Sequence, residues 1–361
     1  MMPLETILHA YIDANIILAL GALIWFAAQT ILIRTRLRSA HNVQLQLIYG
    51  LLVAIAIAPF LAMFWAPNAV GLNLSDLVVA GYLDGHFAMA PTAFEALLAT
   101  RDTIVLEVAT MSTTAGQIVA AMGLAGICFA TLRMIRNLTQ VRQVVQHSYL
   151  WRSAGRVQVR LTQSASVPFS TRGLRNHYII LPAEMLENPV DLHIALAHEF
   201  QHVRQGDLTW ECLLEILRPL FVFNPAMRYW KGQVERQREL ACDQQVMQRK
   251  GLCVQDYANC LLQVCAKAVQ RRDGMKMPVV ALLQARGRGH ARFLRHRIVQ
   301  MIEVGGVPGQ RWCVPVLLVP LVVAVGLGAL SIQRSGDWSQ DRLMLSTIVN
   351  LERLNQRNGT Y

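Results

Sequence analysis

The chain has 361 residues, of which 53% are hydrophobic and 16% charged, with a formal net charge of +11. A soluble domain usually has about a quarter of its residues charged, so this composition excludes an ordinary soluble protein. It is typical of a polytopic membrane protein that carries one soluble insert. The excess of bases does not call for a nucleic-acid partner, because a basic surface beside a membrane pairs with anionic lipid.

Four nearly uncharged stretches predict transmembrane helices. A helix of ~20 residues rises ~30 Å, which is the thickness of the hydrocarbon core of a bilayer. Buried helices of a large soluble protein are the alternative, but such helices are usually shorter and more often interrupted. The predicted spans are residues 12–33, 45–66, 115–132 and 312–332.

The distribution of charge predicts the orientation of these spans. The link after the first span carries Arg34, Arg36 and Arg38, whereas the 67–112 loop carries five acids and a single base, Arg101. Residues 133–311 hold 26 Lys and Arg against 13 Asp and Glu. Because Lys and Arg near spans are retained in the cytoplasm, we expect the N-terminus, the loop and the 333–361 tail to lie outside. The membrane domain is then 1–136, and 137–311 is a cytoplasmic domain.

The cytoplasmic domain begins with helical and then β-rich patterns. Residues 133–147 predict a helix that leaves the membrane with its basic residues at the membrane end. Residues 157–161 alternate apolar and polar side chains, and residues 178–181 are a second short β-rich run. A small sheet of two or three strands follows from these two runs and the connection between them.

Four helices are predicted after the sheet. Asn188-Pro189 and Asn224-Pro225 each supply an N-cap followed by proline at the first helical position. Gly206 is a suitable C-terminal stop. The helices cover residues 188–206, 207–218, 224–251 and 254–269, and a strongly basic stretch at 285–297 is expected to flank the membrane.

The first of these helices contains His198-Glu199-Phe200-Gln201-His202. Histidines four positions apart leave the same face of a helix one turn apart, so that they can bind one Zn²⁺. Glu199 is placed to act as the general base that takes a proton from the attacking water. The alternative is an ordinary helix face with a solvated glutamate.

Two histidines leave zinc short of the usual three protein ligands. We predict Glu239 as the third ligand, with Glu211 and Glu215 as competing candidates. Asp243 shares a helix face with Glu239 and is expected to accept a hydrogen bond from a ligand imidazole. Asp207 either caps the next helix or supports a ligand in the same way. The metzincin pattern is absent, because Leu208 occupies the position of its third histidine.

The residue that would stabilise the oxyanion remains open. Tyr229 and Tyr257 are both candidates, and the sequence selects neither.

Two functions other than that of a cytoplasmic peptidase also remain open. A non-proteolytic membrane transducer or scaffold with a structural zinc site is the main alternative, although a structural site needs no base. Intramembrane proteolysis is disfavoured because polar residues flank the motif on its helix.

These motifs, in this order and spacing, resemble the BlaR/MecR family of membrane zinc metallopeptidases. The resemblance covers roughly residues 10–335, and the topology is also similar. It implies a mainly α membrane protein with an α+β, gluzincin-like zinc domain between the third and fourth spans. His198, His202 and Glu239 match the metal positions of the family, and Glu199 matches its base. The residues that carry the resemblance are His198 to His202, Gly206-Asp207, Phe223-Asn224-Pro225, Glu239 to Asp243, and Pro168-Phe169-Ser170 leading to Ile179 to Pro182.

The resemblance implies a peptidase of the bacterial cytoplasmic membrane that cleaves itself or a cytoplasmic repressor and so induces antibiotic resistance. The chain departs from the antibiotic sensors because about 29 residues, 333–361, follow the fourth span and contain no Ser-x-x-Lys motif. We therefore expect no penicillin-binding sensor domain. The signal is expected to enter through the 67–112 loop, the tail or an extracytoplasmic sensor partner. A homodimer is a further expectation.

Overall fold

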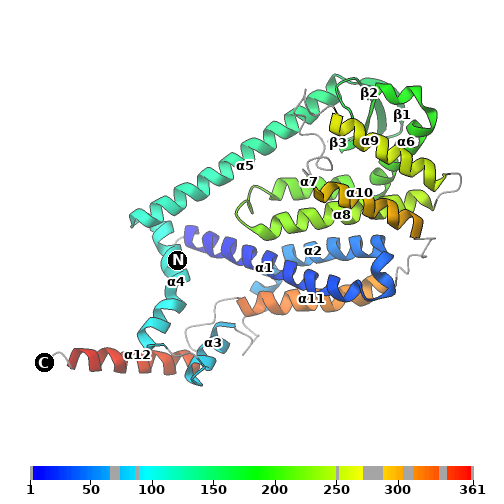
Figure 1. Cartoon of the computed structure of the whole chain (residues 1–361). Helices are drawn as coiled ribbons and strands as arrows, with labels where there is room; N and C mark the ends of the chain where they lie inside the picture. Colours follow the sequence, from blue (N-terminus) through cyan, green and yellow to red (C-terminus); the bar gives the residue numbers. More distant parts are fainter. Residues whose placement is uncertain are drawn as a thin grey trace. The chain divides into compact units, whose positions relative to one another are not determined.

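In the part of the chain that the structure, a computed structural model, describes, the regular elements are helices and one four-stranded sheet (Figure 1). The chain divides into two compact units. Unit 1 comprises Met1–Gln29, Leu47–Ala125 and Trp312–Tyr361, and unit 2 comprises Thr30–Gln46 and Gly126–Arg311. The structure describes residues 3–65, 74–86, 89–248, 252–270, 288–303, 312–332 and 340–358.

Among the described residues, four helices are long and apolar enough to cross a membrane, as expected of a multi-pass membrane protein. They are α1 (Pro3–Leu32), α2 (His41–Trp65), α5 (Thr114–Gln146) and α11 (Cys313–Ile332). Each coincides with one predicted span, except that Ile33 follows the end of α1 and Trp312 precedes α11. Ala66, the last residue of the second span, lies outside the described residues. The third span and the exit helix predicted at 133–147 form one continuous helix, because no Gly or Pro separates them.

Unit 1 also contains a small cluster of helices formed by α3 (Leu74–Leu83), α4 (Pro91–Thr110) and α12 (Gln340–Asn358). Its buried core consists of Val79, Phe94, Leu345 and Val349. The predicted 67–112 loop and the predicted tail therefore pack together, which sequence analysis did not anticipate. Polar contacts reinforce this packing. The Thr92 backbone N–H donates to Glu352 Oε2 at 2.9 Å, and Arg353 pairs with Glu95 at 2.6 Å.

The sheet of unit 2 has the strand order β1-β2-β4-β3. Its strands are β1 (Tyr149–Ala154), β2 (Val157–Thr162), β3 (Phe169–Arg172) and β4 (His177–Pro182). The β2–β4 pair is parallel, and β1 and β3 add antiparallel at the two edges. Strands β2 and β4 were predicted, whereas β1 and β3 were not, so the prediction of two or three strands was too low. Most of β1 is exposed, so it lacks the apolar periodicity that marks a half-buried strand.

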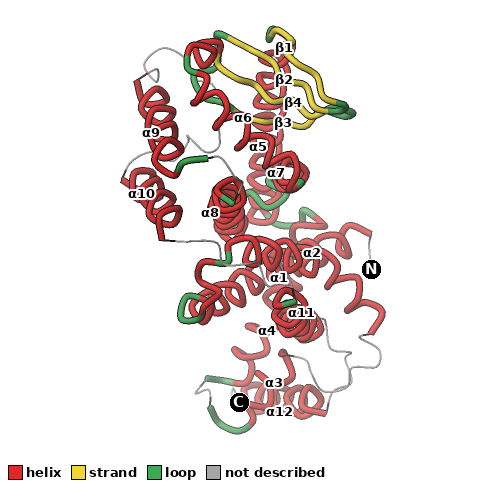
Figure 2. Tube along the Cα trace, turned by 90° about the vertical axis from the view of Figure 1, so that its right-hand side faces the viewer, coloured by secondary structure: helices red, strands yellow, loops and turns green. Residues whose placement is uncertain are grey.

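The central strand β4 is buried on both faces, and this fixes the position of the first helix after the sheet. Ile179 and Leu181 pack with Ala195 of α6 (Pro189–Gln205) on one face. Ile180 packs with Val144 of α5 on the other face. Successive side chains of a strand point to opposite faces. Three adjacent residues of β4 therefore pack against α6 on one face of the sheet and against α5 on the other. Figure 2 shows the sheet with α6 beside it.

The remaining helices of unit 2 follow the predicted order. Asn188 Oδ1 caps α6 by accepting from the N–H groups of Val190 and Asp191, and α6 ends at Gly206 with φ 75°. This left-handed conformation favours glycine. The helices are α7 (Asp207–Leu217), α8 (Pro225–Met247), α9 (Val254–Gln270) and α10 (Arg288–Glu303), with short 3₁₀ helices at Arg36–Ser39 and Ala183–Glu187. Gly251, where the third helix was predicted to end, and residues 285–287 of the basic stretch lie outside the described residues.

Candidate metal centre

The two histidines of the motif meet through their Nε2 atoms. His198 Nε2 and His202 Nε2 lie 3.2 Å apart, and the two rings are perpendicular. His202 is buried, and the His198 side chain is 14% exposed. Their Nδ1 atoms point away from each other toward other groups, and these groups determine the tautomer of each ring.

His202 is oriented by Asp207. Its Nδ1 lies 2.9 Å from Asp207 Oδ2, and the Asp207 side chain is fully buried. Sequence analysis left Asp207 either as a helix cap or as support for a ligand. The N-cap of α7 is Gly206, without a side-chain cap hydrogen bond, and Asp207 contacts the imidazole instead. An aspartate acceptor keeps a proton on Nδ1 and leaves the Nε2 lone pair available.

His198 is oriented through a tyrosine. Its Nδ1 lies 2.7 Å from Tyr257 Oη, and the Tyr257 hydroxyl donates to Asp243 Oδ1 at 2.8 Å. Asp243 Oδ1 is 3.6 Å from His198 Nδ1, so the hydrogen bond that we expected Asp243 to accept from the ring passes through Tyr257. The Tyr257 hydroxyl is therefore committed to His198 and Asp243.

Glu239 of α8 faces both Nε2 atoms. Its Oε2 lies 3.5 Å from His198 Nε2, and its Oε1 lies 3.5 Å from His202 Nε2. The residue is 0% exposed, and neither carboxylate oxygen accepts a hydrogen bond from the described residues. The competing candidates are engaged elsewhere, since Glu211 pairs with Arg238 at 2.6 Å and Glu215 pairs with Lys231.

These three groups fit a metal ion. Nitrogen and oxygen ligands about 2.0–2.2 Å from a tetrahedral zinc are about 3.3–3.5 Å apart. The observed separations between the donor atoms are 3.2, 3.5 and 3.5 Å. Two imidazole lone pairs and a buried carboxylate that converge on one point repel each other unless a cation lies between them.

Cys242 brings a fourth donor near the two histidines. One ligand atom from each of His198, His202 and Cys242 lies within 4.8 Å of the others. Cys242 Sγ, however, is 3.5 Å from Nδ1 of His198 and 3.4 Å from its carbonyl oxygen. The sulfur therefore lies on the side of His198 that faces Tyr257, whereas Glu239 faces Nε2. The carboxylate is better placed than the thiol to complete the set.

Arg297 of α10 is a site residue that sequence analysis missed. Its Nε and Nη2 donate to the two oxygens of Asp243, both at 2.7 Å, and its Nη1 lies 3.2 Å from Glu239 Oε2. The guanidinium is buried. In the sequence Arg297 is one of several bases in a stretch assigned to the membrane surface, so nothing distinguished it. It therefore contacts both Glu239 and Asp243, the two acids that share one face of α8.

The site holds its negative charge strongly. Burial alone would raise the pKa of Glu239, but Arg297 and then the two imidazoles hold that pKa well below its usual range. Burial alone would lower the pKa of His198, but the neighbouring Cys242 sulfur and the Glu239 carboxylate raise it to about 10. The lowered pKa of Glu239 and the raised pKa of His198 have one consequence, which is that the carboxylate and the ring nitrogens together attract a cation.

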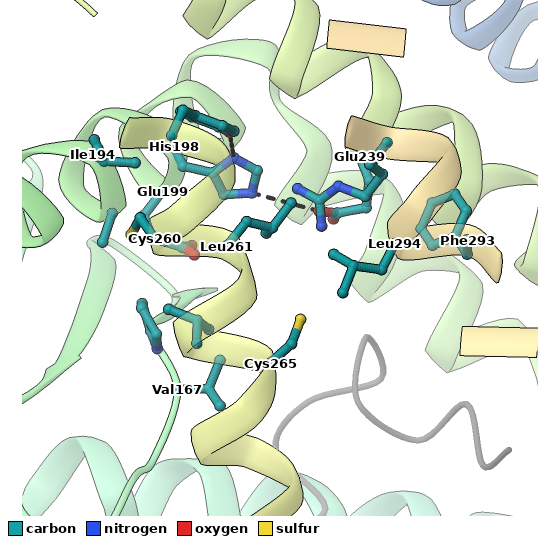
Figure 3. Close-up of a pocket in the computed structure, with 15 residues that line it drawn as sticks. Val167, Ile194, His198, Glu199, Glu239, Cys260, Leu261, Cys265, Phe293 and Leu294 are labelled. Carbon is teal, nitrogen blue, oxygen red and sulfur yellow. Dashed lines mark hydrogen bonds and ion pairs between the residues drawn. The ribbon is translucent and has the colours of Figure 1, made fainter. Parts of the chain in front are cut away.

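Glu199 lies at a pocket beside these donors. It is buried, and it lines the pocket together with His198 and Glu239 (Figure 3). The rest of the wall is largely apolar. It includes Val167, Ile194, Leu261, Val264, Phe293 and Leu294. A carboxylate next to three converging donor groups, in a pocket with a largely apolar wall, can transfer protons to and from a bound amide.

Asp207 offers a direct test of the orientation of His202. We expect Asp207→Ala to weaken zinc binding about 10- to 100-fold, because the imidazole loses the partner that fixes its tautomer. Competition with a chelating dye measures the affinity. Glu187→Ala, an exposed acid in the same unit, is the control and should bind zinc as the wild type does. Equal affinities of wild type and Asp207→Ala would show that Asp207 does not support the site.

Comparisons with known proteins identify the family of this chain. A sequence profile of the BlaR1 peptidase M56 family matches residues 10–286. Over 77 residues the chain is 31% identical to the methicillin resistance mecR1 proteins of Staphylococcus aureus and Staphylococcus epidermidis. That segment covers 21% of this chain and 13% of each relative. On the profile match over most of its length, the chain belongs to the BlaR1 peptidase M56 family of metallopeptidases.

Proposed function

We propose that this protein is a membrane-bound regulatory zinc endopeptidase that transduces an extracytoplasmic signal by cleaving itself or a cytoplasmic repressor-like protein. The observation that carries the proposal is the position of Glu199, in an apolar pocket next to three converging donors, His198, His202 and Glu239. A structural metal site has no use for a free carboxylate in a pocket at its edge.

In this mechanism Zn²⁺, when bound by His198, His202 and Glu239, supplies Lewis acidity that polarises the scissile carbonyl and makes water more acidic. Glu199 takes a proton from the attacking water and passes it to the leaving amine. Asp207 and Tyr257 hold the two imidazoles in the tautomer that leaves Nε2 free. The apolar wall of the pocket orients an apolar substrate side chain and excludes bulk water.

The charge distribution supports a topology with both termini outside the cytoplasmic membrane of a bacterium and the metal centre in the cytoplasm. The partners that we propose are a cytoplasmic protein substrate such as a transcriptional repressor, the lipid bilayer, an extracytoplasmic sensor partner and a second copy of the chain. The staphylococcal relatives are named for methicillin resistance. We propose regulation of antibiotic resistance for this chain by analogy, although it covers 13% of the length of those relatives.

Cys242 favours a second candidate function. A fourth protein donor near the two histidines would allow a closed, structural site in a non-proteolytic transducer or scaffold. The two functions differ in their dependence on Glu199. A peptidase requires its carboxylate, whereas a scaffold does not.

Removal of the metal tests the proposal. We expect the purified protein, reconstituted in lipid nanodiscs, to cleave itself or peptides derived from bacterial cytosol. Phenanthroline should lower this cleavage at least about 100-fold, and stoichiometric Zn²⁺ should restore it, because His198, His202 and Glu239 would then again hold the ion that would supply Lewis acidity. Mass spectrometry of the products measures the cuts. Cleavage that continues unchanged in the chelator would contradict a metallopeptidase.

A further inference from the structure

A buried histidine at the start of α2 contacts two helices of the metal centre. His41 is the first residue of α2 and is 5% exposed. Its Nδ1 lies 3.1 Å from Gln237 Oε1, and its Nε2 lies 3.2 Å from Gln300 Oε1. All three residues belong to unit 2, and sequence analysis assigned a role to none of them.

The two glutamines belong to the helices that bring Glu239 and Arg297 together. Gln237 is on α8, two residues before Glu239, and Gln300 is on α10, three residues after Arg297. Arg297 Nη1 contacts Glu239 Oε2 at 3.2 Å. His41 therefore bridges the same pair of helices whose spacing sets the distance between the arginine and the carboxylate.

The two hydrogen bonds of His41 differ in the direction of donation. A neutral imidazole donates from one nitrogen and accepts at the other, so one glutamine presents its carbonyl oxygen and the other its amide N–H. Gln237 is 4% exposed, so water can scarcely replace its bond to the imidazole. Because both contacts are buried or partly buried, a displacement of His41 has to be followed by α8 and α10 or leave polar groups unpaired.

Helix α2 carries this contact into the membrane. It runs from His41 to Trp65, and His41–Phe60 is a candidate membrane span. Pro59, which cannot donate a backbone hydrogen bond, lies at the end of this span that is remote from His41. Residues up to Gln46 belong to unit 2, and residues from Leu47 belong to unit 1. A helix is stiff along its axis because each turn is hydrogen-bonded to the next. A shift of the span therefore moves its first turn.

We propose that His41 is a positioning residue that couples movement of the α2 span to the metal centre. By holding Gln237 and Gln300, it sets the spacing between α8 and α10. This spacing determines how strongly Arg297 competes with the metal ion for the Glu239 carboxylate. The inference rests on the proposed function, since it names how that site is regulated from the membrane.

Bilayer thickness provides a mechanical input that requires no knowledge of the natural signal. The full chain, loaded with Co²⁺, is reconstituted in vesicles of dimyristoleoyl or dierucoyl phosphatidylcholine, which differ in hydrocarbon thickness. Hydrophobic mismatch biases the position of a span. We expect the rate of cobalt loss to EDTA in the wild type to differ about threefold to tenfold between the two lipids. The visible spectrum of cobalt should differ as well.

In His41→Ala this dependence on lipid should disappear, and cobalt loss should be equally fast in both vesicles. Gln44→Ala is the matched control. Gln44 is buried in the same turn of α2, but its side chain donates to the backbone oxygens of Leu37 and Arg38, at 2.8 and 3.1 Å. This variant should retain the dependence of the wild type. His41→Asn, with a shorter side chain, replaces His41→Ala if the latter binds no cobalt.

The outcomes separate the two proposals. If the wild type shows the same rate in both lipids, or if the His41 variant responds to thickness as the wild type does, the coupling is wrong and the peptidase is unaffected. If the wild type binds no cobalt at all, both the coupling and the metal centre fail. Loss of the response in Gln44→Ala as well would assign the effect to the first turn of α2 in general and overturn the role of His41.

Discussion

Replacement of Glu199 by glutamine is expected to lower peptide-bond cleavage about a thousandfold while zinc stays bound. The amide has the shape of the carboxylate but accepts no proton at neutral pH. Glu199 lines the pocket and does not belong to the group of donor atoms that converge at His198 and His202. Metal content and cleavage, measured on the same preparation, should therefore separate. Cleavage is followed by mass spectrometry, and zinc by elemental analysis.

The matched control is Glu187→Gln, which makes the same chemical change at an exposed position of unit 2. It should leave both cleavage and zinc unchanged. A Glu199→Gln protein that still cleaves at the wild-type rate would show that another group is the base. A protein that signals normally in cells without cleaving anything would favour the scaffold.

The parts of the site that could be predicted are those encoded within a single helix. His198, Glu199 and His202 follow from the helical period, which places residues four apart on one face. The same rule places Glu239 and Asp243 on one face of another helix, but it does not choose Glu239 over Glu211 and Glu215 as the third ligand. The caps Asn188 and Asn224 were predicted as well, because capping depends on a residue and its immediate neighbours.

Tyr257 as a partner of His198, and Arg297 altogether, could not be predicted in this way. Tyr257 lies 59 positions from His198, and Arg297 lies 54 positions from Asp243. No helical or strand period spans such distances, so these contacts depend on how α9 and α10 pack against α6 and α8. From the sequence, a tyrosine in an apolar helix is expected to pack in the core, and an arginine in a basic stretch is expected to be solvated. Tyr257 and Arg297 therefore gave no sign of a role in the site.

The same limit applies to the sheet and to the helices of unit 1. The edge strands β1 and β3 are completed by their neighbours and carry little apolar periodicity of their own. The pairing of α12 with α4 depends on contacts such as Arg353 with Glu95, 258 positions apart. The described helices of the loop and the tail therefore share one buried core. From the sequence, the 67–112 loop and the tail were two separate candidates for the entry point of the signal.

Arg297 keeps a buried partner when Glu239, the proposed third ligand, is replaced, so we expect the surrounding structure to stay folded. Substitution of Glu239 removes one of the two acids that Arg297 contacts, but the paired hydrogen bonds to Asp243, both at 2.7 Å, remain. The buried guanidinium is therefore not left without a partner, which would be strongly destabilising. Tyr257 also keeps its acceptor, so His198 keeps its orientation.

Replacement of Glu239 by alanine is accordingly expected to lower zinc affinity at least about 100-fold and to abolish cleavage. Loss of a direct ligand should cost no less than the 10- to 100-fold typical of its supporting residues. Competition with a chelating dye measures the affinity. Glu187→Ala, which removes an exposed acid of unit 2, should bind zinc as the wild type does. Cys242→Ala tests the competing assignment, in which the cysteine is the third ligand. If it loses zinc while Glu239→Ala retains it, the centre is built from two histidines and a thiolate, and Glu239 serves Arg297 instead of the metal.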